Sequence, residues 1–173
     1  MLIAISLLSI LLVVTVSFYP LAIKTWTSGK DNYQLRSELS QARDLMSNYL
    51  LKASTFTIIN SGIIIFSANV DQTSPAAESC VFYLYNSNDS AWPATYSRPS
   101  YELRFMTYTG IPSFGQGRSI LGDTTTNLAY PHGLLPPPST YFSSSGSQIT
   151  ISLGETKNKE NMNIFFNVHP RNL

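Results

Sequence analysis

The opening sequence MLIAISLLSILLVVTVSFYPLAI, residues 1–23, contains no charged side chain and is followed at once by Lys24. As a helix, a stretch of this length spans about 33 Å, which is enough to cross a hydrocarbon core about 30 Å thick. We therefore expect residues 1–23 to lie in lipid and to hold the rest of the chain at a membrane surface.

This apolar segment has three possible interpretations: a cleaved secretory signal, a simple anchor, or the apolar half of a longer helix that assembles beside copies of itself. A signal peptide needs a basic region before a short apolar core, and no Lys or Arg precedes Lys24. An ordinary anchor carries Lys or Arg on its cytoplasmic side, whereas here Lys24 and Lys30 follow the segment. Either the C-terminal part is cytoplasmic, or the sequence lacks its true N-terminus.

The pattern becomes that of an amphipathic helix in residues 27–54. Apolar side chains recur at spacings of three and four, which places them on one stripe of a helix that we expect to pack against the rest of the protein. This stripe contains Leu35, Leu39, Ala42, Met46 and Tyr49. The side expected to face water contains Arg36, Glu38, Arg43, Asp44 and Asn48.

The two helical parts form either one kinked helix of about 50 residues or two helices that abut. Ser28-Gly29 marks a possible break, and Asp31 with Gln34 resembles a capping pair at a new helix start. Pro20 removes one backbone hydrogen bond and should bend the first part.

Strand-like segments follow the helix. Residues 55–60 and 62–67 are rich in β-branched side chains around the turn signal Asn60-Ser61-Gly62, which predicts a hairpin. Further strands are predicted at residues 80–85, 101–108, 148–153 and 161–168, the last two joined by a loop at 154–160.

The predicted fold class is therefore α+β, with a long N-terminal helix packed on an antiparallel sheet of about five or six strands. The expected units are 1–26, the apolar half of the helix, 27–54, its amphipathic half, and 55–173, a β-rich head. Residues 86–100 and 109–146 are predicted to be long loops, because they hold most of the Pro, Gly and Ser.

The charge and the cysteine content exclude some functions and some structural features. A formal net charge of +1, without any block of like charge, gives no strong attraction for nucleic acid. The single Cys80 forbids an internal disulfide and is predicted to be a small buried hydrophobe.

The sequence predicts no catalytic, cofactor or metal site. Neither His132 nor His169 has a Cys, His or acidic neighbour at ligand spacing, so both are expected in surface or turn positions. The carboxylates are scattered along the chain, and no nucleophile motif is present. Asn88-Asp89-Ser90 fits the glycosylation triplet, which often arises by chance.

Residues 2–14, LIAISLLSILLVV, resemble the N-terminal helix of type IV pilins and type II secretion pseudopilins, especially the J-type minor pseudopilins and PilW-like proteins. The ending Val168-His169-Pro170-Arg171-Asn172-Leu173 is also similar to the C-terminus of many such proteins. Prepilins of this family carry a basic leader, a methylated Phe and a Glu. The leader, the Phe and the Glu are absent here, and Met1 would fall just after that Glu, so either the sequence starts at an internal Met or the protein has lost this processing route. We expect the first, a sequence that is N-terminally truncated relative to the family.

The resemblance implies a non-enzymatic minor subunit that helps to initiate or cap a pilus-like or type II secretion filament. It implies a single-pass inner-membrane protein with an extracytoplasmic head, whose partners are lipid, the inner-membrane assembly machinery and other pilin-like subunits. The helix residues expected to pack in the assembly are Ile3, Ile5, Leu8, Leu12, Val13, Val16 and Pro20. Small and hydroxylated residues, among them Ser9, Thr15 and Ser17, would permit close helix approach or would simply bond to their own backbone carbonyls.

A second hypothesis is a membrane-anchored extracytoplasmic binding module with Tyr-rich loops, and the third and weakest is a tethered enzyme. The tyrosines that suggest a binding surface are Tyr96, Tyr101, Tyr108, Tyr130 and Tyr141. A charged residue at Leu8 or Val13 should abolish the assembly of a pilin, whereas a binding module should act without its anchor.

Overall fold

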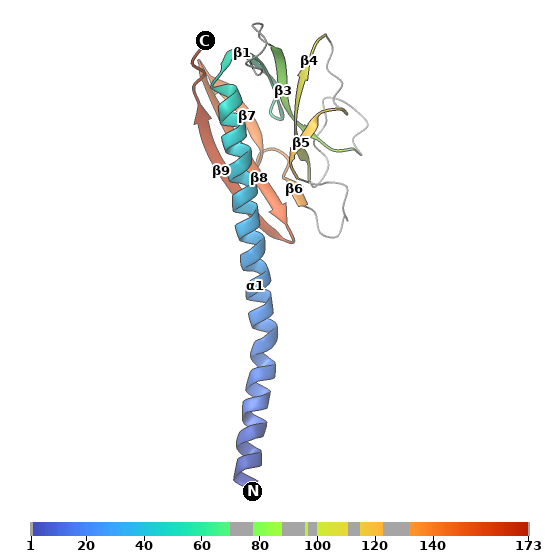
Figure 1. The fold of residues 1–173 in the computed structure, drawn as a ribbon, viewed down its shortest axis with the longest axis vertical. Helices are drawn as coiled ribbons and strands as arrows, with labels where there is room; N and C mark the ends of the chain where they lie inside the picture. Colours follow the sequence, from blue (N-terminus) through green and yellow to red (C-terminus); the bar gives the residue numbers. More distant parts are fainter. Residues whose placement is uncertain are drawn as a thin grey trace.

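A computed structural model of the chain describes residues 2–69, 78–87, 96, 100–110, 115–122 and 132–172. Its dominant element is a single helix, α1 (Leu2–Leu50), of 49 residues. Ser28 and Gly29 lie inside this helix, so of the two expected arrangements the structure has the single helix of about 50 residues, without a break at Ser28-Gly29. Figure 1 shows α1 running beside the head at its C-terminal end and projecting alone at its N-terminal end.

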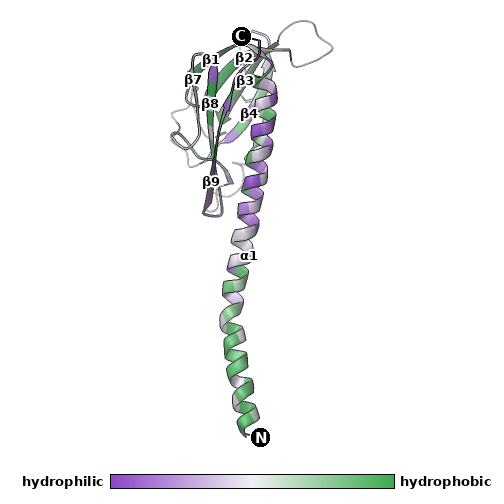
Figure 2. Ribbon diagram, turned by 90° about the vertical axis from the view of Figure 1, so that its left-hand side faces the viewer, coloured by the Kyte–Doolittle hydropathy of each residue, from purple (hydrophilic) through white to green (hydrophobic). Residues whose placement is uncertain are grey.

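The projecting half of α1 is apolar and exposed. Residues 3–23 are exposed along their whole length, and this half forms the hydrophobic end of the helix in Figure 2. The hydroxyls of Ser9, Thr15 and Ser17 donate hydrogen bonds of 2.8 Å to the carbonyl four residues earlier, which satisfies them within the helix. Pro20 lies inside the helix without ending it.

The other half of α1 packs against the head, chiefly on β8 (Gln148–Lys157) and β9 (Glu160–Val168). Each of its main apolar side chains is buried because the 3.6-residue repeat places them on one face. They are Leu35, Leu39, Ala42, Met46 and Leu50. Tyr49 is half-buried, and its ring centroid lies 4.6 Å from that of Phe105.

Asp31 does not cap a helix start, because it lies well inside α1. Its side chain is buried, and its Oδ2 atom accepts a hydrogen bond of 3.1 Å from Asn158. Three residues earlier, the Ser28 hydroxyl donates a 2.6 Å hydrogen bond to Glu160. The two contacts fasten the helix to the turn between β8 and β9 and to the first residue of β9.

The described part of the head contains strands in two sheets. The first sheet has the order β1-β2-β3-β4-β5, all antiparallel. In the second, β8 pairs with β9 along one edge and with β7 and β6 along the other. The strands are β1 (Ala53–Asn60), β2 (Ile63–Ala68), β3 (Glu78–Tyr85), β4 (Glu102–Tyr108), β5 (Arg118–Leu121), β6 (His132–Leu134), β7 (Tyr141–Ser145), β8 (Gln148–Lys157) and β9 (Glu160–Val168).

The α+β class is confirmed, but the single sheet of five or six strands is wrong. Strands β5, β6 and β7 lie within residues 109–146, which the sequence predicts to be a loop. The two sheets meet where Tyr101 and Leu134 exchange backbone hydrogen bonds of 2.8 and 2.7 Å.

The β8–β9 hairpin is longer than the sequence predicts, because its turn contains only Asn158 and Lys159. Both residues have positive φ, 49° and 78°, as a two-residue hairpin turn of type I′ requires. The predicted loop at 154–160 is therefore mostly strand, and Glu155 belongs to β8.

One main hydrophobic core joins the packed face of α1 to both sheets. Phe66, Phe82 and Phe105 stack within it at centroid distances of 5.0 to 6.5 Å. Cys80 is fully buried in the same core, which confirms the prediction for this residue.

Candidate functional site

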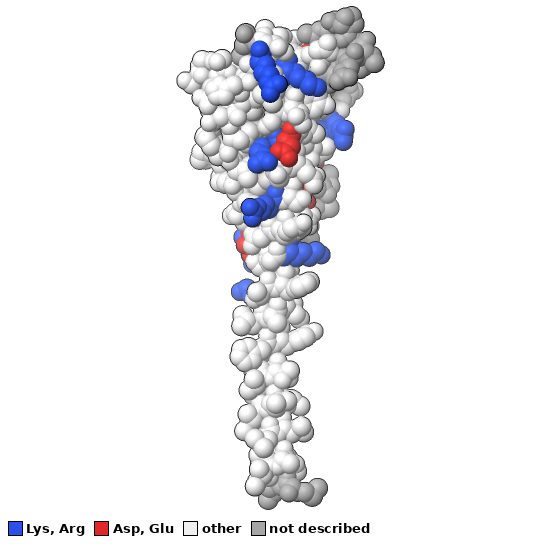
Figure 3. Space-filling view, turned by 60° about the vertical axis from the view of Figure 1, so that its left-hand side comes forward, with Lys and Arg blue, Asp and Glu red and all other residues white. Residues whose placement is uncertain are grey.

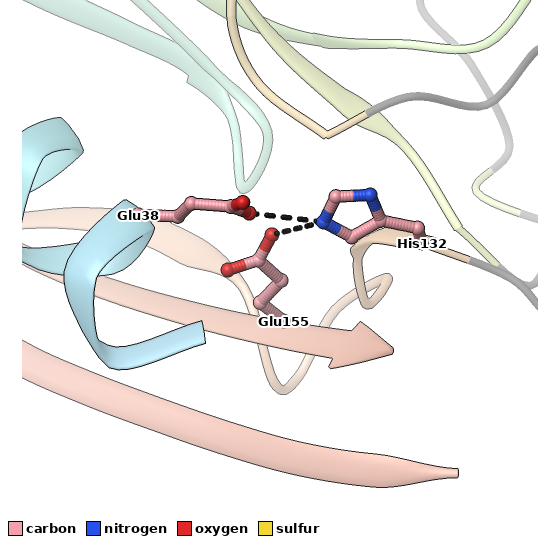
Figure 4. A group of neighbouring side chains, drawn as sticks. All are labelled: Glu38, His132 and Glu155. Carbon is pink, nitrogen blue, oxygen red and sulfur yellow. Dashed lines mark hydrogen bonds and ion pairs between the residues drawn. The ribbon is translucent and has the colours of Figure 1, made fainter. Parts of the chain in front are cut away.

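Three ionisable side chains converge where α1 crosses the second sheet (Figure 4): Glu38 of α1, His132 of β6 and Glu155 of β8. The His132 Nε2 atom lies 2.9 Å from Oε2 of Glu38 and 3.3 Å from Oε1 of Glu155. One possible ligand atom from each residue lies within 4.8 Å of the others. We call these three residues the Glu-His-Glu cluster.

Strand register brings His132 beside Glu155. His132 pairs with Lys157 and Leu134 pairs with Glu155, so His132 and Glu155 are diagonal neighbours on one face of the sheet. Along β8 the same face carries the buried row Ile149, Ile151 and Leu153. Glu155 occupies the next position of this row, where an apolar residue would ordinarily lie.

Glu38 reaches the cluster from the edge of the packed face of α1. Gln34, one turn earlier, donates a 2.6 Å hydrogen bond to Oε1 of Glu38, which leaves Oε2 directed at His132. The side chain of Glu38 is only 25% exposed. The prediction that Glu38 belongs to the water-facing side of the helix is therefore wrong.

Glu155 is the most deeply buried member of the cluster, with no exposed side-chain surface. Among the residues that the structure describes, neither of its carboxyl oxygens has a hydrogen-bond partner of good geometry. The free-energy cost of removing this carboxyl group from water is therefore largely uncompensated, because the contact with His132 is long. His132 is 23% exposed and forms part of the cluster's opening to solvent.

The environment shifts the pKa of each group. Burial raises the pKa of Glu155 to about 7, although His132 opposes this effect. Burial also acts to raise the pKa of Glu38, but hydrogen bonds from Gln34 and His132 outweigh it and lower that pKa. The contact with Glu155 raises the pKa of His132 against the opposing effect of burial, and Glu38 adds to the rise.

Sequence reasoning missed this cluster because its members lie far apart in the chain. His132 is 94 positions from Glu38 and, by their numbers, 23 from Glu155, so no spacing motif joins them. The expectation of a turn or surface position for His132 is wrong, whereas His169 is exposed after β9. The one available signal was a Glu continuing the alternating apolar pattern of residues 149–153.

The helix residues predicted to take part in assembly all lie on the exposed half of α1. All of them are exposed, so the described part of the head does not bury them, and Pro20 lies on the same half. These residues are Ile3, Ile5, Leu8, Leu12, Val13 and Val16.

The tyrosines predicted to form a recognition surface are not exposed where the structure describes them. Tyr101 is completely buried, and Tyr96, Tyr108 and Tyr141 are half-buried. Tyr130 and the triplet Asn88-Asp89-Ser90 lie outside the described residues.

These features define a class: a protein with one N-terminal helix long and apolar enough to span a membrane, continuous with the helix of an α+β head. No protein-family model, curated protein or solved structure matches the chain.

Proposed function

We propose that this protein is a structural subunit of a membrane-derived filament, of the minor pilin or pseudopilin kind, and that it helps to initiate or cap the filament. The observation that supports the proposal best is the continuity of α1. One unbroken helix carries an exposed apolar half and a half packed into the core of the head.

The projecting half needs cover from water over its whole circumference. Leu8 and Val13, for example, are 66% and 62% exposed, and no charged residue occurs before Lys24. Lipid can provide this cover before assembly, and the same half of neighbouring subunits can provide it afterwards. Figure 3 agrees with this division, since on the face it shows the charged side chains lie on the head and the adjoining helix.

A change of side-chain chemistry marks the boundary between the halves. Lys24 and Lys30 are the first charges of the chain, and Trp26 and Tyr33 are 79% and 78% exposed. Trp, Tyr and Lys are typical of the interface between hydrocarbon and water. Their position supports a membrane-embedded segment that ends near residue 24, with the head close to the membrane.

Because α1 is unbroken, the packing of the apolar halves would fix the positions of the heads. A flexible tether would not transmit such order. This mechanical continuity favours a filament subunit over an anchor that merely retains a binding module or an enzyme. We further propose that the head is extracytoplasmic, that the membrane is the inner membrane, and that the partners are other pilin-like subunits and their assembly machinery.

Cysteine cross-linking in native cells tests the proposal. The only natural thiol, Cys80, is buried, so it gives little background. Leu8→Cys, Leu12→Cys and Val16→Cys, which lie along one stripe of the helix, should each form disulfide-linked products with cysteine variants of neighbouring subunits. Arg36→Cys, on the exposed side of the packed half, serves as a comparison outside the apolar half. Uncross-linked monomer at all three apolar positions would overturn the proposal.

An anchor exchange separates a filament subunit from a binding module. Residues 2–23 are replaced by an unrelated Leu/Ala helix of equal length, and the full chain is returned to a deletion strain. A filament subunit should lose function, because the packing surface has changed, whereas a binding module should keep it. Labelling of Asn48→Cys with a membrane-impermeant maleimide in intact cells reports the side of the membrane on which the head lies, since Asn48 is exposed.

A further inference from the structure

We propose that Glu38, His132 and Glu155 bind one divalent transition-metal ion, with Zn²⁺ the best chemical match, and that the ion ties α1 to strands β6 and β8. This inference does not depend on the function proposed above. It rests on the geometry, burial and donor chemistry of the Glu-His-Glu cluster.

Two of the three separations between the ligand atoms match those of a small tetrahedral site, and all three are within 4.8 Å. With metal–ligand bonds of about 2.0–2.1 Å, the ligands of a tetrahedral Zn²⁺ lie about 3.3 Å apart. Nε2 of His132 lies 2.9 Å from the Glu38 oxygen and 3.3 Å from the Glu155 oxygen. Only small side-chain movements would therefore place one ion in contact with all three residues (Figure 4).

The state of Glu155 is a second, independent observation that points to a ligand. This carboxyl group is fully buried and aimed into the cluster, yet within the described part of the chain neither of its oxygens has a hydrogen bond of good geometry, and the contact of Oε1 with Nε2 of His132 is long, at 3.3 Å. A buried polar group in a native protein ordinarily has a partner. A metal ion between Glu155 and His132 would supply one.

The charges also fit a divalent cation. Two carboxylates and one neutral imidazole carry a total charge of −2, which a 2+ ion neutralises in a partly buried place where unpaired charge is costly. One nitrogen and two carboxylate oxygens suit Zn²⁺ and similar transition metals. Ca²⁺ prefers six to eight oxygen ligands, and Mg²⁺ usually keeps several waters, so both fit this small mixed set less well.

The surroundings of the cluster would let a metal ion enter and would hold its ligands in position. Glu38 and His132 keep about a quarter of their side-chain surface exposed, which leaves room for a water as fourth ligand. Gln34 holds the other oxygen of Glu38, as outer-shell hydrogen bonds commonly do for metal ligands. The ligands come from three elements far apart in sequence, so the ion would act as a cross-link between helix and sheet.

The test uses the tag-free full chain in detergent micelles, first freed of metal with a chelator. Titration calorimetry with ZnCl₂ should show one ion per chain with micromolar or tighter affinity, and Zn²⁺ should raise the melting temperature. CoCl₂ should give visible absorption bands of a four-coordinate site, and Zn²⁺ should abolish those bands.

Matched variants locate the site. His132→Gln and Glu155→Gln should each weaken Zn²⁺ binding at least about tenfold, because the loss of an outer-shell partner alone typically costs about 10–100-fold. His169→Gln, the same change at the only other histidine, and Glu78→Gln on β3 should leave binding unchanged. Circular dichroism verifies folding, and Glu155→Gln keeps the result interpretable if His132→Gln misfolds, because Gln matches the shape of a buried Glu.

The proposal is overturned by any one of three results. The first is the absence of saturable Zn²⁺ and Co²⁺ binding to the wild-type chain. The second is binding that survives both cluster substitutions. The third is that His169→Gln weakens binding as much as His132→Gln does. In the last two cases the ion would lie elsewhere.

Discussion

The Nε2 atom of His132 lies 2.9 Å from Oε2 of Glu38, although 94 positions separate the two residues in the chain. This contact joins a three-residue strand to the long helix at a point where the sheet would otherwise meet it through apolar side chains. Together with the pairs Ser28–Glu160 and Asp31–Asn158, it forms a polar fastening between α1 and the second sheet. The orientation of the head on its helix therefore depends on specific polar contacts as well as on apolar burial.

The two halves of α1 should respond differently to the same substitution. Leu39→Ala removes a fully buried side chain and should lower the free energy of unfolding of the head by about 2–5 kcal/mol. Leu8→Ala, at an exposed position, should leave the stability of the head unchanged. Thermal unfolding of both variants in detergent, followed by circular dichroism, measures the difference. Equal losses would mean that the apolar half also supports the head.

Glu155→Leu should raise the free energy of unfolding of the metal-free head by about 0–3 kcal/mol. The substitution continues the buried row of Ile149, Ile151 and Leu153 and removes a buried carboxyl group without a hydrogen bond among the described residues. Urea unfolding in the presence of a chelator is the measurement. A loss of more than about 1 kcal/mol would show that the carboxyl group is well satisfied in the folded protein.

Lys159→Gly should raise stability by about 0.5–1 kcal/mol, because Lys159 has a φ of 78° that glycine adopts without a steric cost. The resulting Asn-Gly pair is the favoured sequence for a two-residue hairpin turn. Lys157→Gly, the same change two residues earlier in β8, should instead destabilise by a similar amount. Melting temperatures of the two variants should move in opposite directions, and a fall in both would contradict the assigned turn.

Cys80 should be inert in the folded protein. Burial raises the pKa of its thiol from 9.0 to about 12, and the nearby Glu78 adds to the rise. Because the unfolded thiol ionises first, the contribution of Cys80 to stability is complete below about pH 9 and is lost as the pH rises toward 12. Maleimide should label the native thiol far more slowly than the urea-unfolded thiol, whereas rapid native labelling would disprove its burial.

The pH dependence of stability that is predicted for Cys80 has a matched control, the variant Cys80→Ala. In Cys80→Ala, the part of the stability loss at alkaline pH that the thiol causes should disappear. The smaller side chain should lower stability at every pH. A wild-type curve and a Cys80→Ala curve that run parallel from pH 8 to 10.5 would show that the thiol does not contribute.

Much of the fold could be predicted from local pattern. The apolar segment, the buried stripe through Leu39 and Met46, and the strands that became β1 to β4 were visible because their side-chain periods are those of a helix or a strand. Strand β6, the sequence His-Gly-Leu, and strand β7, rich in Ser, carry no such pattern. They are strands because β8 offers them hydrogen-bonding partners.

The sequence by itself determined that an uncharged segment long enough to span a membrane precedes an amphipathic helix and a β-rich head. These properties depend on neighbouring residues and on short repeats, which any helix or strand must obey. The tertiary structure alone decided that α1 is unbroken at Ser28-Gly29, that the strands divide into two sheets, and that Glu38, His132 and Glu155 meet. The physical reason is that strand pairing and helix docking join residues about 20 to 130 positions apart, and the free energy of these contacts exists only once the chain has folded.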